Sequence, residues 1–255
     1  MEKRFVGKVA LVTGATNGIG QATAVRLATE GALVGVNQKP TGDATETLRR
    51  IKEAGGEGFA VVADMRNPQQ IVDMVGEVAR RGGRLDYVVS NAGINPFMKW
   101  DETSIEDWDN LSETNLRGTW IVTTEGAKQM IKEGHGGAIV CTSSISAHVG
   151  SPFQSAYCAT KGGISMWAKA FGAVVGKNGI RVNAVEPGWI VTNMSIPMFD
   201  DKAAVKYYEE RIALGRPGQP EEMAGAITFL LSDDASYVTS ATLLVDAGFI
   251  VNAEL

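Results

Sequence analysis

KVALVTGATNGIG, residues 8–20, joins a short apolar segment directly to a glycine-rich loop. Residues 8–13 are mostly apolar and include β-branched side chains, which predicts a buried strand. Gly14, Gly18 and Gly20 follow with GxxxGxG spacing, rather than the GxGxxG of the common dinucleotide fingerprint. QATAVRLATEG then has the pattern of an amphipathic helix. Glycine lets a pyrophosphate approach the free N–H groups of a helix N-terminus, so this junction predicts nucleotide binding, although packing alone requires glycine in many such turns.

The rest of the chain repeats this alternation of apolar strands and helices. Further strands are expected at residues 32–37, 59–64, 85–90, 137–142, 180–185 and 242–246. Helices are expected at about 42–54, from Asn67-Pro68, at about 104–133 with a break near Asn115, and at about 154–178, 201–212 and 220–231. Such alternation favours a parallel sheet covered on both faces, and right-handed crossovers then give a doubly wound α/β fold. No linker or repeat divides the chain, so residues 1–255 are expected to form one nucleotide-binding domain.

Composition argues against several functions. The 255 residues are 44% apolar and 21% charged and carry a net charge of −5, which is ordinary for a globular protein. No basic patch indicates nucleic acid, and no apolar run approaches the roughly 18 residues of a membrane span, so neither partner is expected. Cys141 and Cys158 lack metal or disulfide spacing, and with two histidines no metal site is expected. The sequence predicts a cytoplasmic protein that acts on a small molecule.

Tyr157 and Lys161 stand four residues apart in a segment expected to be helical, so their side chains share one face. An ammonium beside a phenol favours the phenolate, and we expect it to lower the tyrosine pKa from about 10. Tyr157 would then be an acid or base usable near neutral pH. Ser144, thirteen residues before the tyrosine, is a candidate to hold a substrate oxygen. Tyr-x-x-x-Lys is also a common helical pair, so the other motifs decide between these interpretations.

The end of the second expected strand indicates which dinucleotide binds. An acidic residue about 20 positions after the glycines binds the 2′-hydroxyl of NAD. Gln38 and Lys39 occupy this place, and no carboxylate does. Lys39 is a candidate partner for the 2′-phosphate of NADP, or else a solvated loop lysine. Asn17 in the glycine loop is not basic, so the sequence leans to NADP and leaves NAD open.

Taken together, these motifs resemble those of the short-chain dehydrogenase/reductase family over essentially the whole chain. The matching motifs are Thr13–Gly20, Asn91-Ala92-Gly93, Asn115, Ser144, Tyr157-x-x-x-Lys161, Pro187-Gly188 and Thr192. The resemblance implies a Rossmann fold with a seven-stranded parallel sheet in the order 3-2-1-4-5-6-7, a nicotinamide cofactor and a homotetramer. Two positions depart from the family pattern: Ser90 stands where asparagine is commoner, and position 17 lacks a basic residue.

The resemblance also implies a role for each matching residue. Tyr157 would be the acid or base for the carbinol oxygen, Lys161 would lower its pKa and hold the nicotinamide ribose, and Ser144 would bond the reacting oxygen. Asn115 would hold a water in a proton relay. The implied cofactor contacts are Gly14, Thr16, Asn17, Gly18, Ile19, Gln38, Lys39, Asp64 at the adenine, Met65, Asn91 at the centre of the cofactor, Gly93, Tyr157, Lys161, Pro187, Gly188, Ile190, and Thr192 at the carboxamide.

Polar residues near the expected carboxyl ends of the strands indicate a sugar-like substrate. The expected substrate-binding residues are Asn95, Ser144, Ser146, Gln154, Tyr157 and Trp189. Buried donors and acceptors discriminate strongly for a substrate with matching hydroxyls. SSISAHVGSPFQSAY (143–157) and LLVDAGFIVN (243–252) are similar to segments of sugar 1-dehydrogenases that act on L-rhamnose-like aldoses, which implies oxidation of a cyclic hemiacetal to a lactone. A substrate lid is expected at about 190–212.

Two other functions stay open. Carbonyl reduction of the 3-oxoacyl carrier-protein type predicts a basic patch beside the pocket, for which Lys99 and Arg117 are the candidates. A nucleotide-sensing scaffold without catalysis is the alternative from another class. The intact set of Asn115, Ser144, Tyr157 and Lys161 argues against the scaffold, because a pure sensor has no need of all four.

Overall fold

The centre of the fold is a seven-stranded parallel sheet in the order β3-β2-β1-β4-β5-β6-β7. The computed structural model describes residues 3–251, without the side chains of Pro197, Met198 and Ala204. The strands are β1 (Val9–Val12), β2 (Leu33–Gln38), β3 (Glu57–Val62), β4 (Tyr87–Ser90), β5 (Gly137–Thr142), β6 (Ile180–Pro187) and β7 (Thr242–Val245). The expected doubly wound Rossmann fold and its strand order are therefore confirmed.

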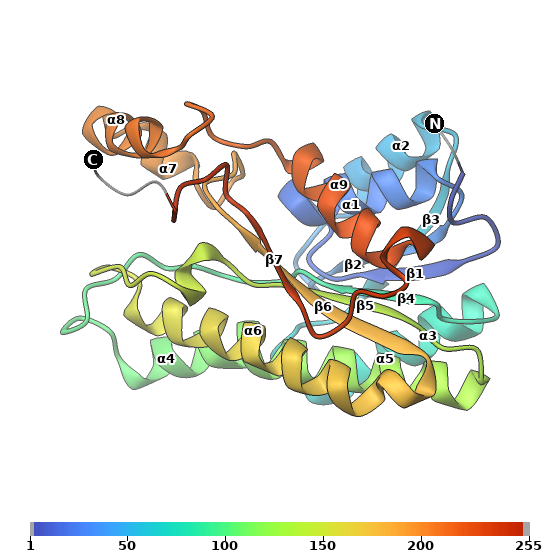
Figure 1. The fold of residues 1–255 in the computed structure, drawn as a ribbon. Helices are drawn as coiled ribbons and strands as arrows, with labels where there is room; N and C mark the ends of the chain where they lie inside the picture. The colour runs from blue at the N-terminus through green and yellow to red at the C-terminus, as the bar shows by residue number, and fades with distance from the viewer. Residues whose placement is uncertain (1–2, 252–255) are drawn as a thin grey trace.

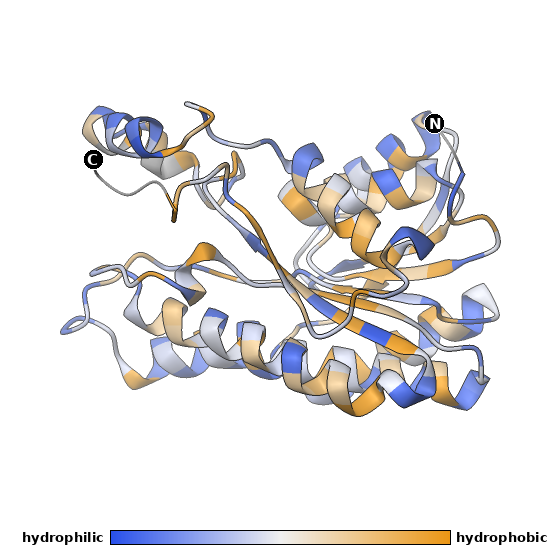
Figure 2. Ribbon diagram, in the orientation of Figure 1, coloured by the Kyte–Doolittle hydropathy of each residue, from blue (hydrophilic) through white to orange (hydrophobic). Residues whose placement is uncertain are grey.

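Helices cover both faces of this sheet (Figure 1). One face carries α1 (Gly18–Thr29), α2 (Thr45–Glu53) and α9 (Pro220–Leu231), and the other carries α3 (Pro68–Gly82), α4 (Ile105–Ser112), α5 (Gly118–Glu133) and α6 (Ser155–Val175). The short helical turns are η1 (Glu113–Arg117), η2 (Ile145–Ala147), η3 (Gly176–Asn178) and η4 (Asp233–Ala235). Each layer encloses its own apolar cluster, with Leu27 and Ile227 in one and Met130 and Ile164 in the other. Figure 2 shows apolar colour concentrated along the sheet between the two layers.

Local sequence signals begin and end the helices near the expected places. Asn67 caps α3 by accepting a hydrogen bond from the Gln70 N–H at 3.2 Å, and Pro68 follows in the first turn. Gly83 ends the helix with a φ of 75°, a value that glycine adopts without strain. The expected break near Asn115 is η1, a π-helical turn between α4 and α5.

Two segments differ from the expected boundaries. The strand expected at 59–64 spans Glu57–Val62, because the chain leaves the sheet after Val62 and turns toward α3. No helix was expected before residue 201, yet α7 (Ile196–Phe199) forms there and precedes α8 (Lys202–Arg211). These two helices stand over the carboxyl ends of the strands, at the left of Figure 1, where the candidate site lies.

Candidate active site

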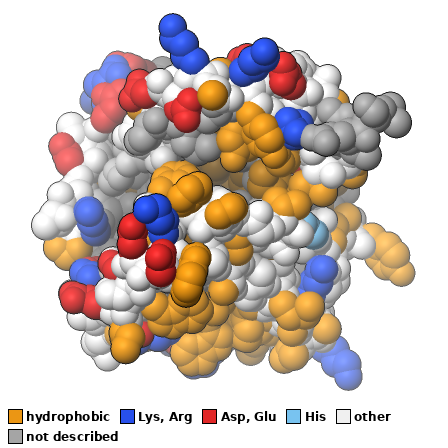
Figure 3. Space-filling model, turned by 90° about the vertical axis from the view of Figure 1, so that its left-hand side faces the viewer, with side chains coloured by type: hydrophobic (Ala, Val, Ile, Leu, Met, Phe, Trp, Pro, Cys, Tyr) orange, Lys and Arg blue, Asp and Glu red, His pale blue; other side chains and the backbone are white. Residues whose placement is uncertain are grey.

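A cavity of about 620 Å³ opens at the carboxyl ends of the strands. Its wall includes the glycine loop, the ends of β2 and β3, the turn after β4, the segment after β5, the start of α6 and residues 187–195. Every residue expected to bind cofactor or substrate lies on this wall, and of the expected catalytic residues only Asn115 does not. Figure 3 shows the hollow from the side of the carboxyl ends of the strands, with apolar side chains around its opening.

The glycine loop needs its glycines for packing as well as for access. A Cβ on Gly20 would lie 2.3 Å from the Gly14 carbonyl oxygen, and a Cβ on Gly14 would lie 2.7 Å from Ala92 Cα. Gly14 and Gly18 also have φ values of 59° and 55°. Asn17 makes no side-chain cap on α1, so this loop offers the N-terminus of the helix to an anion in the cavity.

Two asparagines hold this loop. Asn37 Oδ1 accepts a hydrogen bond from the Gly14 N–H at 3.1 Å, and Asn91 Nδ2 donates to the Thr13 and Gly14 carbonyls at 3.1 and 3.2 Å. Asn91 is therefore a support of the loop as well as part of the wall. Sequence reasoning missed Asn37. The signal was an asparagine at the end of the apolar segment 32–37, because a buried polar side chain needs a hydrogen-bond partner.

The far end of the cavity carries two cations. Lys39 lies on the wall and is exposed, and Arg66 lies beside it, a residue that sequence reasoning did not single out. Arg66 donates to Asp64 at 2.9 Å, and this hydrogen bond holds the pKa of the Asp64 carboxyl below its usual range. Gln38 is tied down, because its side-chain oxygen accepts from the Ala44 N–H at 2.8 Å. This end therefore offers cationic groups to a phosphorylated ribose.

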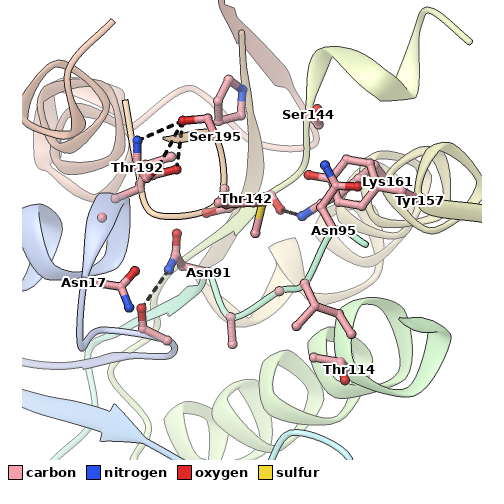
Figure 4. A pocket seen from close by; sticks show the side chains of 18 of the residues that line it. Asn17, Asn91, Asn95, Thr114, Thr142, Ser144, Tyr157, Lys161, Thr192 and Ser195 are labelled. Atoms are coloured by element: carbon pink, nitrogen blue, oxygen red, sulfur yellow. Dashed lines mark hydrogen bonds between the residues drawn. The ribbon is translucent and has the colours of Figure 1, made fainter. Parts of the chain in front are cut away.

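Three of the four candidate catalytic residues, Ser144, Tyr157 and Lys161, meet at the opposite end of the cavity (Figure 4). Ser144 follows β5 with extended backbone, and its Oγ accepts a hydrogen bond from the Ser146 N–H at 3.1 Å. Tyr157 and Lys161 lie one turn apart on α6, and they are 8% and 4% exposed. The Lys161 ammonium donates to the Thr142 carbonyl at 2.8 Å and lies 5.4 Å from the centre of the Tyr157 ring. The structure therefore brings together the three side chains that the sequence spacing had selected.

The expected effect of Lys161 on the Tyr157 pKa is wrong for this arrangement. Burial raises the pKa of Tyr157 to about 12, and the opposing hydrogen bond from Ser144 is the weaker influence. Burial also lowers the pKa of Lys161 to about 8. The ammonium donates to the Thr142 carbonyl, and burial is the largest influence on the pKa of each group.

Asn115 stands behind the cavity and fixes the turn that follows β4. Its Oδ1 accepts from the Ile94 N–H at 2.8 Å, and its Nδ2 donates to the Ile94 carbonyl at 2.9 Å and to Thr160 Oγ1 at 3.3 Å. The side chain is completely buried. Asn115 therefore joins the turn carrying Gly93 to α6, and the π-helical turn supplies the local geometry for this.

The expected substrate residues surround Ser144 and Tyr157. Asn95, Ser146, Gln154 and Trp189 line this part of the cavity, as do Phe97 beside Asn95 and Met194 in the expected lid. Thr142 and Tyr208 also line it, and sequence reasoning missed these two. Asn95 Oδ1, Thr142 Oγ1 and Trp189 Nε1 are buried without a hydrogen-bond partner in residues 3–251. The Trp189 ring stacks on Phe199 with ring centres 4.5 Å apart and lies tilted against Tyr208 at 4.9 Å, so α7 and α8 pack against the wall of the cavity at Trp189.

The described residues were also compared with the requirements of a metal site and of a membrane span. Residues 3–251 contain no group of three His, Cys, Asp or Glu side chains with the geometry to hold a metal ion. Across the same residues, no helix is both long and apolar enough to cross a bilayer.

The cavity suits a dinucleotide. It runs from Lys39 and Arg66, along the glycine loop, to Ser144 and Tyr157. In this loop a single added Cβ on Gly14 or Gly20 would clash with neighbouring atoms. A glycine loop for a dinucleotide phosphate that leads to a buried Ser–Tyr–Lys group is typical of a nicotinamide-dependent oxidoreductase acting on CH–OH groups, in which the cofactor supplies the hydride chemistry.

Comparison with known proteins agrees with this class. The family described as "Enoyl-(Acyl carrier protein) reductase" matches residues 14–250. The L-rhamnose 1-dehydrogenase (NAD(P)(+)) of Sphingomonas sp. strain SKA58 is 41% identical over 253 residues, covering 99% of this chain and all of its own. A 3-oxoacyl-[acyl-carrier-protein] reductase of Staphylococcus epidermidis is 37% identical over 95% of this chain and 99% of its own. A gluconate 5-dehydrogenase of Burkholderia cenocepacia, solved with NADP and tartrate, has a TM-score of 0.93 at 32% identity, covering 99% of this chain and 98% of its own. The chain belongs to the short-chain dehydrogenase/reductase family.

Proposed function

We propose that the protein oxidises the anomeric hydroxyl of an L-rhamnose-like aldose to a lactone, with NADP or NAD as hydride acceptor. The observation that carries this is the polar wall around Ser144 and Tyr157, where Asn95, Ser146 and Gln154 face a cavity that also holds unpaired buried atoms. Unpaired buried groups favour a substrate rich in hydroxyls, because such a substrate gives each of them a partner. The full-length similarity to L-rhamnose 1-dehydrogenases supports the same substrate class.

In the proposed reaction, Ser144 and Tyr157 hold the anomeric hydroxyl. Tyr157 must first lose its own proton to water, because burial holds its pKa at about 12. The phenolate Oη then takes the hydroxyl proton while the C1–H bond breaks, and the new C=O bond at C1 gives the lactone. A bound nicotinamide would supply the acceptor for the hydride from C1. Lys161, with its pKa near 8, is mostly protonated at pH 7 and supplies positive charge that favours the phenolate.

Carbonyl reduction of an acyl group on a carrier protein has less support. Lys99 pairs with Glu102 at 3.0 Å, and Arg117 pairs with Glu113 at 2.7 Å and donates to the Arg66 carbonyl. These acids neutralise the two cations that an acidic carrier protein would need. The basic patch expected for this alternative is therefore not formed by these residues.

We further propose that NADP is the preferred cofactor and that NAD also serves. Lys39 and Arg66 lie at the end of the cavity where a phosphorylated ribose would bind. Position 38 carries glutamine rather than the acidic residue that favours NAD. We propose that Asp64 meets the adenine, with its carboxylate held by Arg66 at 2.9 Å.

The remaining proposals concern organisation. We propose one domain over residues 1–255 with a lid at about 190–212, and the stacking of Phe199 and Tyr208 on Trp189 supports a lid that closes over the substrate. We propose a homotetramer, supported by the exposed apolar side chains of Trp120 on α5 and Val174 on α6. A cytoplasmic location is supported by two free cysteines.

A substrate panel tests the proposal. Aldoses, simple secondary alcohols and 3-oxoacyl esters are each assayed by absorbance of the reduced nicotinamide, in the oxidative and reductive directions. We expect the highest kcat/KM for L-rhamnose or a close stereoisomer, with lactone as product. A preference of ten-fold or more for 3-oxoacyl reduction would replace this proposal by the alternative.

A further inference from the structure

A buried carboxylate lies behind the catalytic residues and takes no part in the mechanism above. Glu186, near the end of β6, is 1% exposed. One oxygen of its carboxylate bonds His148 Nε2 at 2.6 Å, and the other accepts from Ser165 Oγ at 2.6 Å. A buried carboxylate is costly unless it is paired and hydrogen-bonded, so this position is held by specific partners.

The contacts continue from Ser165 toward the active site. Ser165 Oγ lies 2.8 Å from Ser143 Oγ, and Ser143 Oγ donates to the backbone carbonyl of Lys161 at 2.8 Å. Ser143 immediately precedes Ser144 in the chain. One continuous series of close polar contacts, here called the path, therefore joins β6, the segment 143–149 and α6, which are the elements that carry Glu186, Ser144 and Tyr157. The two serine hydroxyls have one proton each, so they donate two of the three hydrogen bonds between these groups at any one time.

This path does not carry protons to the reacting atoms. It ends on the backbone carbonyl of Lys161, whereas the ammonium of Lys161 bonds the Thr142 carbonyl instead. Neither Glu186 nor His148 lies on the cavity wall, so neither reaches substrate. What the path does is tie His148, at the end of η2, to β6 and thus fix the turn that begins at Ser144.

We propose that Glu186 and His148 are positioning residues, which hold the segment 143–149 so that Ser144 is aligned with Tyr157. This inference rests on the proposed roles of Ser144 and Tyr157. The start of the segment is held to β6 by its backbone, because the Ser143 N–H donates to the Val185 carbonyl at 2.8 Å. The turn that follows has mainly local bonds, from the amides of Ala147, His148 and Val149 to the carbonyls of Ser144 and Ile145. Without the link to Glu186, Ser143 stays tied to β6, but the turn after Ser144 loses the side-chain bond that joins it to this strand.

The test compares Glu186→Ala with a matched control, Glu30→Ala. Glu30 is also a fully buried, ion-paired carboxylate, held by Arg4 and Arg26 on the far side of the sheet. Both variants are expected to lower the melting temperature. Glu186→Ala is expected to lower kcat by roughly 10- to 100-fold, the effect of misplacing a catalytic group by about 1 Å, with KM and the dissociation constant of NADP changed less than three-fold. Glu30→Ala is expected to leave kcat of the folded enzyme within two-fold of wild type.

Two further measurements separate positioning from simple loss of stability. Glu186→Gln keeps an acceptor for Ser165 and an amide for His148, so it should recover most of kcat. Hydrogen exchange followed by mass spectrometry should show faster exchange of the amides of residues 146–149 in Glu186→Ala but not in Glu30→Ala, and this needs no substrate. Unchanged exchange together with unchanged kcat would overturn the inference, as would an equal loss of kcat in Glu30→Ala. If wild type oxidises no sugar, the proposed function fails, while the exchange experiment still decides the role of Glu186.

Discussion

Replacing Lys161 by methionine should remove activity and, at pH 7, stabilise the fold. The ammonium of Lys161 is 4% exposed, and burial lowers its pKa from 10.5 to about 8. A difference of about 2.5 between the two pKa values corresponds to roughly 3 kcal/mol of folding free energy, because each pKa unit is worth about 1.36 kcal/mol. Loss of the hydrogen bond to the Thr142 carbonyl offsets about 1 kcal/mol of this gain. The variant should therefore be about 2 kcal/mol more stable than wild type at pH 7.

The sign of the pH dependence follows from the direction of the Lys161 pKa. Below pH 8 the lysine is charged in both the folded and the unfolded chain, so wild type bears the full cost of burying the charge. Between pH 8 and 10.5 the folded chain releases the proton while the unfolded chain keeps it, so wild-type stability rises relative to the variant. The advantage of the variant should disappear by about pH 10. Tyr157, whose pKa is near 12, is present in both proteins and does not change the difference.

Urea unfolding at pH 7, 8, 9 and 10 measures this difference, with Lys169→Met as the control. Lys169 is an exposed lysine on the same helix, so its replacement should give a difference that does not vary with pH. Parallel stability curves for wild type and Lys161→Met across pH 7–10 would refute the reasoning, since they would mean that the buried lysine does not titrate below its ordinary pKa.

Three other substitutions have defined outcomes. Tyr157→Phe should lower kcat by at least about 10³-fold, within the range of general acid–base catalysis, and leave NADP affinity within three-fold by fluorescence titration. Gly20→Ala should abolish dinucleotide binding and lower the melting temperature, because its Cβ would lie 2.3 Å from the Gly14 carbonyl, while Gly162→Ala, with no atom within 4 Å of its Cβ, should do neither. Lys39→Ala should raise KM for NADP about ten-fold and leave KM for NAD unchanged in steady-state assays; an equal rise for both would exclude a role in reading the 2′-phosphate.

The sequence predicted the fold well because the deciding signals are local. Apolar segments of five or six residues, glycine at strand ends and the Asn67-Pro68 cap each act within one element, and their alternation indicates a parallel sheet. The strand order was predicted from the family resemblance. The residues of the cavity wall could be predicted for a similar reason. Parallel strands bring their carboxyl ends to one edge of the sheet, even where the loops that follow them vary.

What the sequence could not supply depends on contacts between distant residues. The direction of the Tyr157 pKa depends on the depth of burial and on where the Lys161 ammonium points, and neither is encoded in a four-residue spacing. The pairing of Glu186 with His148 joins residues 38 apart in the chain. The sequence suggested Lys99 and Arg117 as a basic patch, but in the structure they form ion pairs with Glu102 and Glu113.

The most direct test of the central claim is the oxidation of L-rhamnose by wild type and Tyr157→Phe in the presence of NADP. Formation of reduced cofactor and of the lactone are followed together, by absorbance and by mass spectrometry. The account predicts one lactone for each reduced cofactor with wild type and no detectable turnover with the variant. Equal turnover by the two proteins would contradict the proposed role of Tyr157, and absence of lactone with every aldose would contradict the proposed substrate.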